Sequence, residues 1–286
     1  MALANAALYA FNKAADGDIV ASSEAGDFIA ENLLDSQPGR IWRGVGKEAH
    51  TIEGDFGGTG EAVSSFALTN HNLDELVTVK LELFDADGAT VLYTATWDAV
   101  SPVLGWGEGA WGDVPNIGGY VNGGWTSRNL IKLFSPITAW SYKVTIDNME
   151  SYQDDNYPQA GLLFIGYPFQ PQHKNVMADP AIPVEDPTRL IVTRSQALRS
   201  DPMEPYRVME WTWGFLTTEE TVEFREMCRL VGKRSAIVAS LWPGDDTGRE
   251  VEGQMLCRIV DWTGPEKLPS TITDYYRASV TLREVI

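Results

Sequence analysis

The stretch GWGEGAWG, residues 105 to 112, places Gly105, Gly107 and Ala110 at the spacing of a dinucleotide-binding fingerprint. Such a site needs a strand before the glycines and a helix after them, because the N-terminus of that helix receives the pyrophosphate. The residues that follow, DVPNIGGYVNGGW, contain Pro115 and paired glycines, which exclude a helix at that place. The stretch is therefore not expected to bind a nucleotide, and no cofactor is predicted.

The same stretch belongs to a long Gly-rich loop that carries large aromatic side chains. The candidate contact residues in and just before this loop are Trp97, Trp106, Trp111, Tyr120 and Trp125. Such side chains can fold back as a cap on the core, stack on a sugar ring or dock into a neighbouring protein, since Trp and Tyr bury a large area at a small entropy cost. We predict contacts to a protein or a glycan here, and the core cap remains open as the alternative.

Other residues with chemical potential show no catalytic pattern. His50, His71 and His173 lie far apart and lack HxH or HxxxH spacing, so structural or surface roles are expected and no metal site is predicted. Neighbouring carboxylates occur in DADG, QDDN and GDD, which are typical of acidic turns. No serine occupies a nucleophile elbow and no Cys and His form a recognisable pair, so the chain is not predicted to be an enzyme.

The composition excludes several classes of partner. The 286 residues carry a formal net charge of -18, which repels nucleic acid and anionic bilayers. No apolar run approaches the roughly 20 residues that span a membrane, and no basic leader precedes the first apolar residues. Cys228 and Cys257 are expected to be buried free thiols. Residues 1–168 hold 22 acidic and 8 basic residues against 18 and 14 in residues 169–286, which favours a boundary near residue 168.

The N-terminal part, residues 1–167, is predicted to be an antiparallel β-sandwich. Alternating segments such as EAVSSFALTNH, VTVKLELFDADGATVLYTATW and SYKVTIDN indicate strands, and DADG indicates a hairpin turn. Residues 168–187 are predicted to be a proline-rich connector or extended arm, because proline removes a backbone donor and restricts the residue before it. The prolines of this connector are Pro168, Pro171, Pro180, Pro183 and Pro187.

The C-terminal part, residues 188–286, is predicted to be an antiparallel β domain with one packed helix. RVMEWTWGF alternates so that Met209, Trp211, Trp213 and Phe215 share one face. Thr217 as N-cap and a Glu three residues later predict a capping box, and the helix is expected to end at a glycine, residue 232. Strands are predicted in AIVASLW, GQMLCRIVDW and YYRASVTLREV. The fold class is therefore mainly β.

The N-terminal part resembles the discoidin-like, or galactose-binding-like, jelly rolls. The residues that carry this resemblance are ASSEAGDFIAENLLDSQPGRIWRG with Asp35 and Trp42, HTIEGDFGG with Asp55, Phe56 and Gly57, SSFALTNHNL, and AGLLFIG as closing strand. They cover about 150 residues. The long Trp and Gly insertion is not part of the usual family pattern. The resemblance implies a jelly-roll fold and leaves the ligand open.

Residues 188–286 are similar to the tail-tube-like domain of distal tail and baseplate proteins of long-tailed bacteriophages. The resemblance rests on the order of RVMEWTWGF, TVEFREMCRLVGKRSA, IVASLW and ASVTLREV. It implies a virion structural protein of the tail tip, made in the bacterial host cytoplasm. The implied partners are copies of the chain in a ring, expected to be a hexamer, other tail proteins, and a host-surface glycan at the outward sandwich. The alternative is a carbohydrate-binding module that uses the Trp/Gly-rich loop.

Overall fold

The computed structural model describes residues 5–37, 39–73, 76–100, 129–147, 157–172, 176, 182–192, 198–243, 253–269 and 274–285. The chain forms two compact units. Unit 1 comprises residues 1–170 and 237–256, and unit 2 comprises residues 171–236 and 257–286. The division that the sequence predicts, with a connector over residues 168–187, stays a prediction; in the structure unit 1 also takes in residues 237–256.

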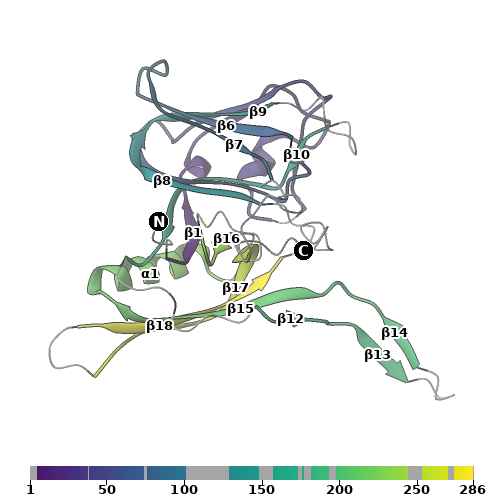
Figure 1. Cartoon of the computed structure of the whole chain (residues 1–286), viewed down its shortest axis with the longest axis vertical. Coiled ribbons are helices and arrows are strands. Elements are labelled where there is room, and N and C mark those ends of the chain that lie inside the picture. Colours follow the sequence, from purple (N-terminus) through teal and green to yellow (C-terminus); the bar gives the residue numbers. More distant parts are fainter. Residues whose placement is uncertain are drawn as a thin grey trace, which may run out of the picture. The chain divides into compact units, whose positions relative to one another are not determined.

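Unit 1 is a β-sandwich of two antiparallel sheets (Figure 1). Five strands of a nine-stranded sheet follow the order β16-β1-β11-β5-β8 and are built from Ala236–Ser240, Ala7–Asn12, Leu162–Phe169, Glu61–Thr69 and Leu130–Ala139. The other has the order β2-β4-β9-β6-β7, built from Ile19–Ala21, His50–Asp55, Ser141–Asp147, Thr78–Phe84 and Val91–Asp98. The turn at DADG joins β6 to β7, with Gly88 at a φ of 66°, and so confirms the predicted hairpin.

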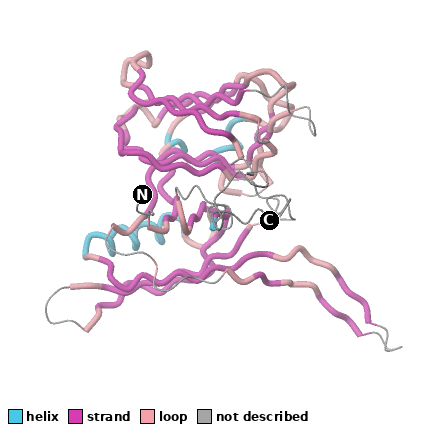
Figure 2. The backbone as a smooth tube through the Cα atoms, viewed as in Figure 1, coloured by secondary structure: helices cyan, strands magenta, loops and turns pink. Residues whose placement is uncertain are grey.

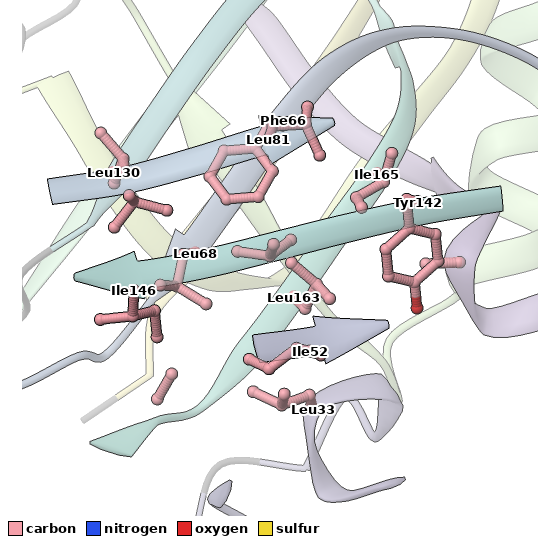
Figure 3. Close-up of a cluster of buried hydrophobic side chains, with 14 of the residues drawn as sticks. Leu33, Ile52, Phe66, Leu68, Leu81, Leu130, Tyr142, Ile146, Leu163 and Ile165 are labelled. Atoms are coloured by element: carbon pink, nitrogen blue, oxygen red, sulfur yellow. The ribbon is translucent and has the colours of Figure 1, made fainter. Parts of the chain in front are cut away.

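Period-two alternation places the apolar side chains of both sheets in one core. The β6 side chains alternate between half-buried and buried along Thr78–Phe84, as expected for a strand with one face on the core. Ile52, Phe66, Leu81 and Leu163 come from four different strands and meet in that core (Figure 3). A short 3₁₀ helix, η2 (Ala30–Leu34), adds Leu33 to the same cluster; the other 3₁₀ helix, η1, covers Ala14–Asp16.

In its described residues, unit 2 contains strands in the order β12-β15-β18-β17. The same residues contain one α-helix (helices are cyan in Figure 2). The strands are Val184–Glu185, Tyr206–Leu216, Tyr276–Glu284 and Gln254–Lys267, of which the last begins within unit 1. A further pair, β13 (Arg189–Val192) and β14 (Leu198–Asp201), forms a separate two-stranded ribbon. The mainly β fold class that the sequence predicts is confirmed by these sheets.

The helix α1 (Thr218–Val231) begins and ends where the sequence predicts. The Thr217 hydroxyl accepts from the backbone N–H of Glu220 at 3.2 Å, and the Glu220 carboxylate accepts from the backbone N–H of Thr217 at 2.7 Å. Gly232 follows as C-cap with a φ of 56°. No helix in the described part of the chain is long and apolar enough to cross a membrane.

Two predictions about side chains have opposite outcomes. Cys228 and Cys257 are free and buried, as predicted, and burial raises the pKa of both thiols, that of Cys228 to about 11. The prediction that Phe215 shares the buried face of β15 is wrong. The pairing of β15 with β18 shifts register between Trp213 and Leu216, so that Leu216 is buried and Phe215 is 36% exposed.

Candidate functional site

The predicted aromatic contact residues fall into two groups. Trp97 lies in β7, where it is half-buried and stacks on Phe66 with ring centroids 5.5 Å apart. This packing against the core fits the alternative of a core cap at that position. Trp106, Trp111, Tyr120 and Trp125 lie outside the described residues, so a glycan or protein contact through them stays a prediction.

A cationic site of unit 1 lies around Arg43 of the short strand β3 (Trp42–Arg43). The Arg43 guanidinium lies 4.3 Å from the ring centroid of Phe28 and 4.2 Å from that of Tyr157. Both rings are therefore within cation–π distance of the guanidinium, and they attract it through the ring quadrupoles and restrict its rotamers. Arg43 itself is half-buried, which leaves part of the group accessible.

Backbone hydrogen bonds bring these three residues together. The Arg43 N–H donates to the carbonyl oxygen of Phe28 at 3.2 Å, and the Arg43 carbonyl oxygen accepts from Ala25 at 2.9 Å. On the other side, Arg43 is paired with Gln159 in the ladder between β3 and β10 (Gln159–Ala160). The Asn72 side chain donates to the carbonyl oxygen of Tyr157 at 3.0 Å and accepts from the Gln159 N–H at 2.8 Å. The Arg43 site is thus built from four chain segments.

A group of hydrogen bonds around Ser23 supports the β3 side of the site. The Ser23 hydroxyl and His50 Nδ1 are 2.8 Å apart, and the same hydroxyl accepts from the Val45 N–H at 3.1 Å. The indole N–H of Trp42 donates to the Ser23 carbonyl oxygen at 3.2 Å. His50 therefore has the structural role that the sequence predicts. His71 is also buried, and His173 lies outside the described residues.

The guanidinium of Arg43 has hydrogen-bonding capacity to spare. Its Nη2 donates to Gln159 Oε1 at a long 3.3 Å. Its Nε is buried, and no acceptor among the described residues lies within hydrogen-bonding distance of it. Within the same described ranges, no carboxylate lies within 4.0 Å of the group. The in-plane N–H groups of a guanidinium suit oxygen acceptors on a ligand.

Two other features of unit 1 offer less for binding. A hollow beside Asp35, Arg40 and Asn70 has a volume of about 10 Å³, which is room for about one water molecule. In the part of the chain that the structure describes, no three His, Cys, Asp or Glu residues gather where they could hold a metal ion. The Arg43 site is therefore the candidate functional site of unit 1.

Sequence reasoning did not find this site. The pair Trp42–Arg43 gives a local signal, because a buried aromatic followed by a cation in a strand directs the cation outward. Phe28 lies 15 residues before Arg43 and Tyr157 lies 114 residues after it, and nothing in the spacing of the three residues links them.

Comparisons with known proteins give matches among solved structures alone. No family model and no curated protein matches the chain. A Streptococcus pneumoniae fucose binding module is 12% identical, with 54% of this chain and 94% of that chain covered and a TM-score of 0.37. The lectin domain of Lectinolysin complexed with Lewis B antigen is 17% identical, covers 54% of this chain and 94% of that chain, and has a TM-score of 0.36.

A third similar structure is the family 32 carbohydrate-binding module of Clostridium perfringens NanJ in complex with galactose. It is 18% identical, covers 54% of this chain and 97% of that chain, and has a TM-score of 0.35. None of these three structures is a phage tail protein, so the tail-tip hypothesis gains no support from them and stays a prediction.

Proposed function

We propose that unit 1 is a non-catalytic carbohydrate-binding domain and that Arg43 donates hydrogen bonds to the hydroxyl groups of a bound sugar. The observation that carries this proposal is the half-buried guanidinium of Arg43, which lies within 4.3 Å of the Phe28 and Tyr157 ring centroids and whose Nη2 makes a long hydrogen bond of 3.3 Å to Gln159. A cation fixed in this way loses little conformational entropy on binding, which favours a ligand as weakly held as a neutral sugar.

The charge of unit 1 favours a neutral sugar over an acidic one. Unit 1 contains 26 acidic and 9 basic residues by sequence, so its field repels anions at long range. A single cation at the Arg43 site does not offset this excess. Neutral hexoses with adjacent hydroxyl groups are the proposed ligand class, and the loop with Trp106 and Trp111 is proposed as an additional contact.

The proposal predicts that Arg43→Ala and Arg43→Lys both weaken sugar binding by about tenfold or more, because a hydrogen bond from a charged donor contributes about 1.5–3 kcal/mol. Arg43→Lys keeps the charge but loses the planar group that the two rings hold. A glycan array on the full chain identifies the sugar, and titration calorimetry with that sugar measures the change in affinity.

The matched control is Arg40→Ala, which removes an exposed cation paired with Asp35 at 3.2 Å in a neighbouring loop. Its affinity for the sugar is expected to equal that of the wild type. A separate variant, Trp106→Ala/Trp111→Ala, tests the loop. An array with no binding, or equal affinity in wild type and Arg43→Ala with both proteins folded, contradicts the proposal.

The second candidate function is the structural one, in which the chain belongs to a ring in a bacteriophage tail tip. The observation that favours it is the ribbon of β13 and β14, whose described strands pair only with each other. A lone two-stranded ribbon is marginally stable in water, so a neighbouring copy is a reasonable support for it. This hypothesis also includes a hexameric ring and a location in the tail tip of the virion.

This second candidate predicts that the chain forms a defined oligomer. Closed rings arise when the same pair of surfaces meets repeatedly around an axis, and the ribbon would then lie on the next copy. Size-exclusion chromatography with light scattering measures the mass. A monomer at high protein concentration contradicts the ring, whereas it leaves the sugar-binding proposal untouched.

A further inference from the structure

Unit 2 contains an open groove on its sheet that neither candidate function explains. The groove has a volume of about 490 Å³, within the range of small-molecule sites. It is lined by Met203, Glu204, Tyr206, Lys233, Arg258 and Arg283, among others. The lining thus combines three cations with apolar side chains, in a chain whose formal net charge is -18.

Two of these cations face each other without a counter-ion. Arg258 of β17 and Arg283 of β18 are direct cross-strand partners, and like charges opposite each other destabilise a sheet. The Arg283 guanidinium lies 3.8 Å from the ring centroid of Tyr206. In the described parts of the chain, neither Arg258 nor Arg283 has a carboxylate oxygen within 4.0 Å, and the buried Nε of Arg258 has no acceptor.

Most nearby carboxylates are already engaged. Glu284 uses both oxygens on Arg207, which it meets at 2.6 to 3.0 Å. Asp261 pairs with Lys233 at 3.3 Å. Glu185 accepts from the hydroxyl of Tyr206 at 2.8 Å. Of the lining carboxylates, the exposed Glu204 alone has no cation within 4.0 Å among the described residues, so the two opposed arginines give the groove an excess of positive charge.

We propose that this groove binds a ligand with an oxyanion group, a carboxylate or a phosphate, placed between Arg258 and Arg283. Two guanidinium groups match the planar or tetrahedral oxygens of such a group, and an anion between them removes their mutual repulsion. Met203 and Val260 line the groove and are 49% and 41% exposed. Their side chains can pack against an apolar part of the ligand.

The charge of unit 2 is compatible with an anionic ligand. By sequence, unit 2 holds 13 basic and 14 acidic residues, so it is close to neutral, in contrast to unit 1. The oxyanion site and the Arg43 site lie in different units, and each can fail in experiment without affecting the other.

Titration calorimetry on the full chain at constant ionic strength tests the proposal with three probes: inorganic phosphate, citrate and the peptide acetyl-Leu-Glu-Leu-Glu-amide. At least one probe is expected to bind the wild type. Binding of phosphate alone identifies the oxyanion as a phosphate, and binding of citrate or the peptide alone identifies it as a carboxylate. Arg258→Gln and Arg283→Gln are each expected to raise the dissociation constant about tenfold, which is about 1.4 kcal/mol.

Arg229→Gln is the matched control, because Arg229 is a 78% exposed arginine on α1 whose ion-pair partner is Glu226. Its dissociation constant is expected to equal that of the wild type. If Arg258→Gln does not fold, Arg283→Gln alone tests the proposal, because Arg283 is exposed and its replacement is expected to leave the fold intact. Absence of binding by all three probes, or equal binding by wild type and the two groove variants, overturns the proposal.

Discussion

Replacing Glu284 by glutamine is expected to lower the free energy of unfolding of unit 2 by about 3–5 kcal/mol, because the change removes a charged partner of the buried Arg207 guanidinium. Both side chains are nearly inaccessible, at 8% and 5% exposure. The Glu284 carboxylate also accepts from the Arg207 backbone N–H at 3.0 Å. Urea denaturation followed by circular dichroism measures the change.

The control for this prediction is an ion pair with the same atom-to-atom distance and a different exposure. Lys267 Nζ and Asp274 Oδ1 are 2.6 Å apart, as are Arg207 Nη2 and Glu284 Oε1, but the Lys267 and Asp274 side chains are 55% and 60% exposed. Asp274→Asn makes the same acid-to-amide change in solvent, where an ion pair contributes little. Equal effects of Asp274→Asn and Glu284→Gln contradict the argument from burial.

A double variant separates the contribution of the ion pair to stability from the cost of removing only one of its two charges. Arg207→Met/Glu284→Leu replaces both groups by apolar side chains, so no charge remains buried. We expect its stability to lie closer to the wild type than that of Glu284→Gln. If the double variant is the less stable protein, the pair itself contributes more to stability than the loss of Glu284 costs the buried Arg207.

The sequence predicts most of the regular structure because its signals are local. The capping box at Thr217 and Glu220 needs only four residues, and it sets the start of α1 correctly. Alternation along β15 is visible within one segment as far as Trp213. It fails at Phe215, because a change of register depends on how β18 pairs with β15, which the segment itself does not contain.

Long-range pairing is the part that could not be predicted. The sequence predicts a strand at AIVASLW within the C-terminal part, but β16 pairs with β1 near the N-terminus, with Leu8 opposite Ala239. Many strands in a β protein have the same alternation, so the pattern does not specify a partner. The same limit applies to the Arg43 site, because its Tyr157 ring comes from a segment 114 residues further along the chain.

Replacing Trp213 by alanine is expected to destabilise unit 2 by about 3–5 kcal/mol, the range for removing a large aromatic side chain from a core. Trp213 is 1% exposed, and its ring lies 5.9 Å from that of Trp211 and 5.9 Å from that of Phe224 on α1. The side chain therefore joins the sheet to the helix. The free energy of unfolding from urea denaturation gives the total effect.

Amide hydrogen exchange shows which elements lose stability in Trp213→Ala. Because Phe224 loses its aromatic partner on β15, amide protection is expected to drop more along α1 than along β6 of unit 1. Phe215→Ala is the matched control, since Phe215 lies on the same strand beyond the register shift and is 36% exposed. A small loss of stability is expected there. If Phe215→Ala destabilises unit 2 as much as Trp213→Ala, the helix is not held by the face of β15 that carries Trp213.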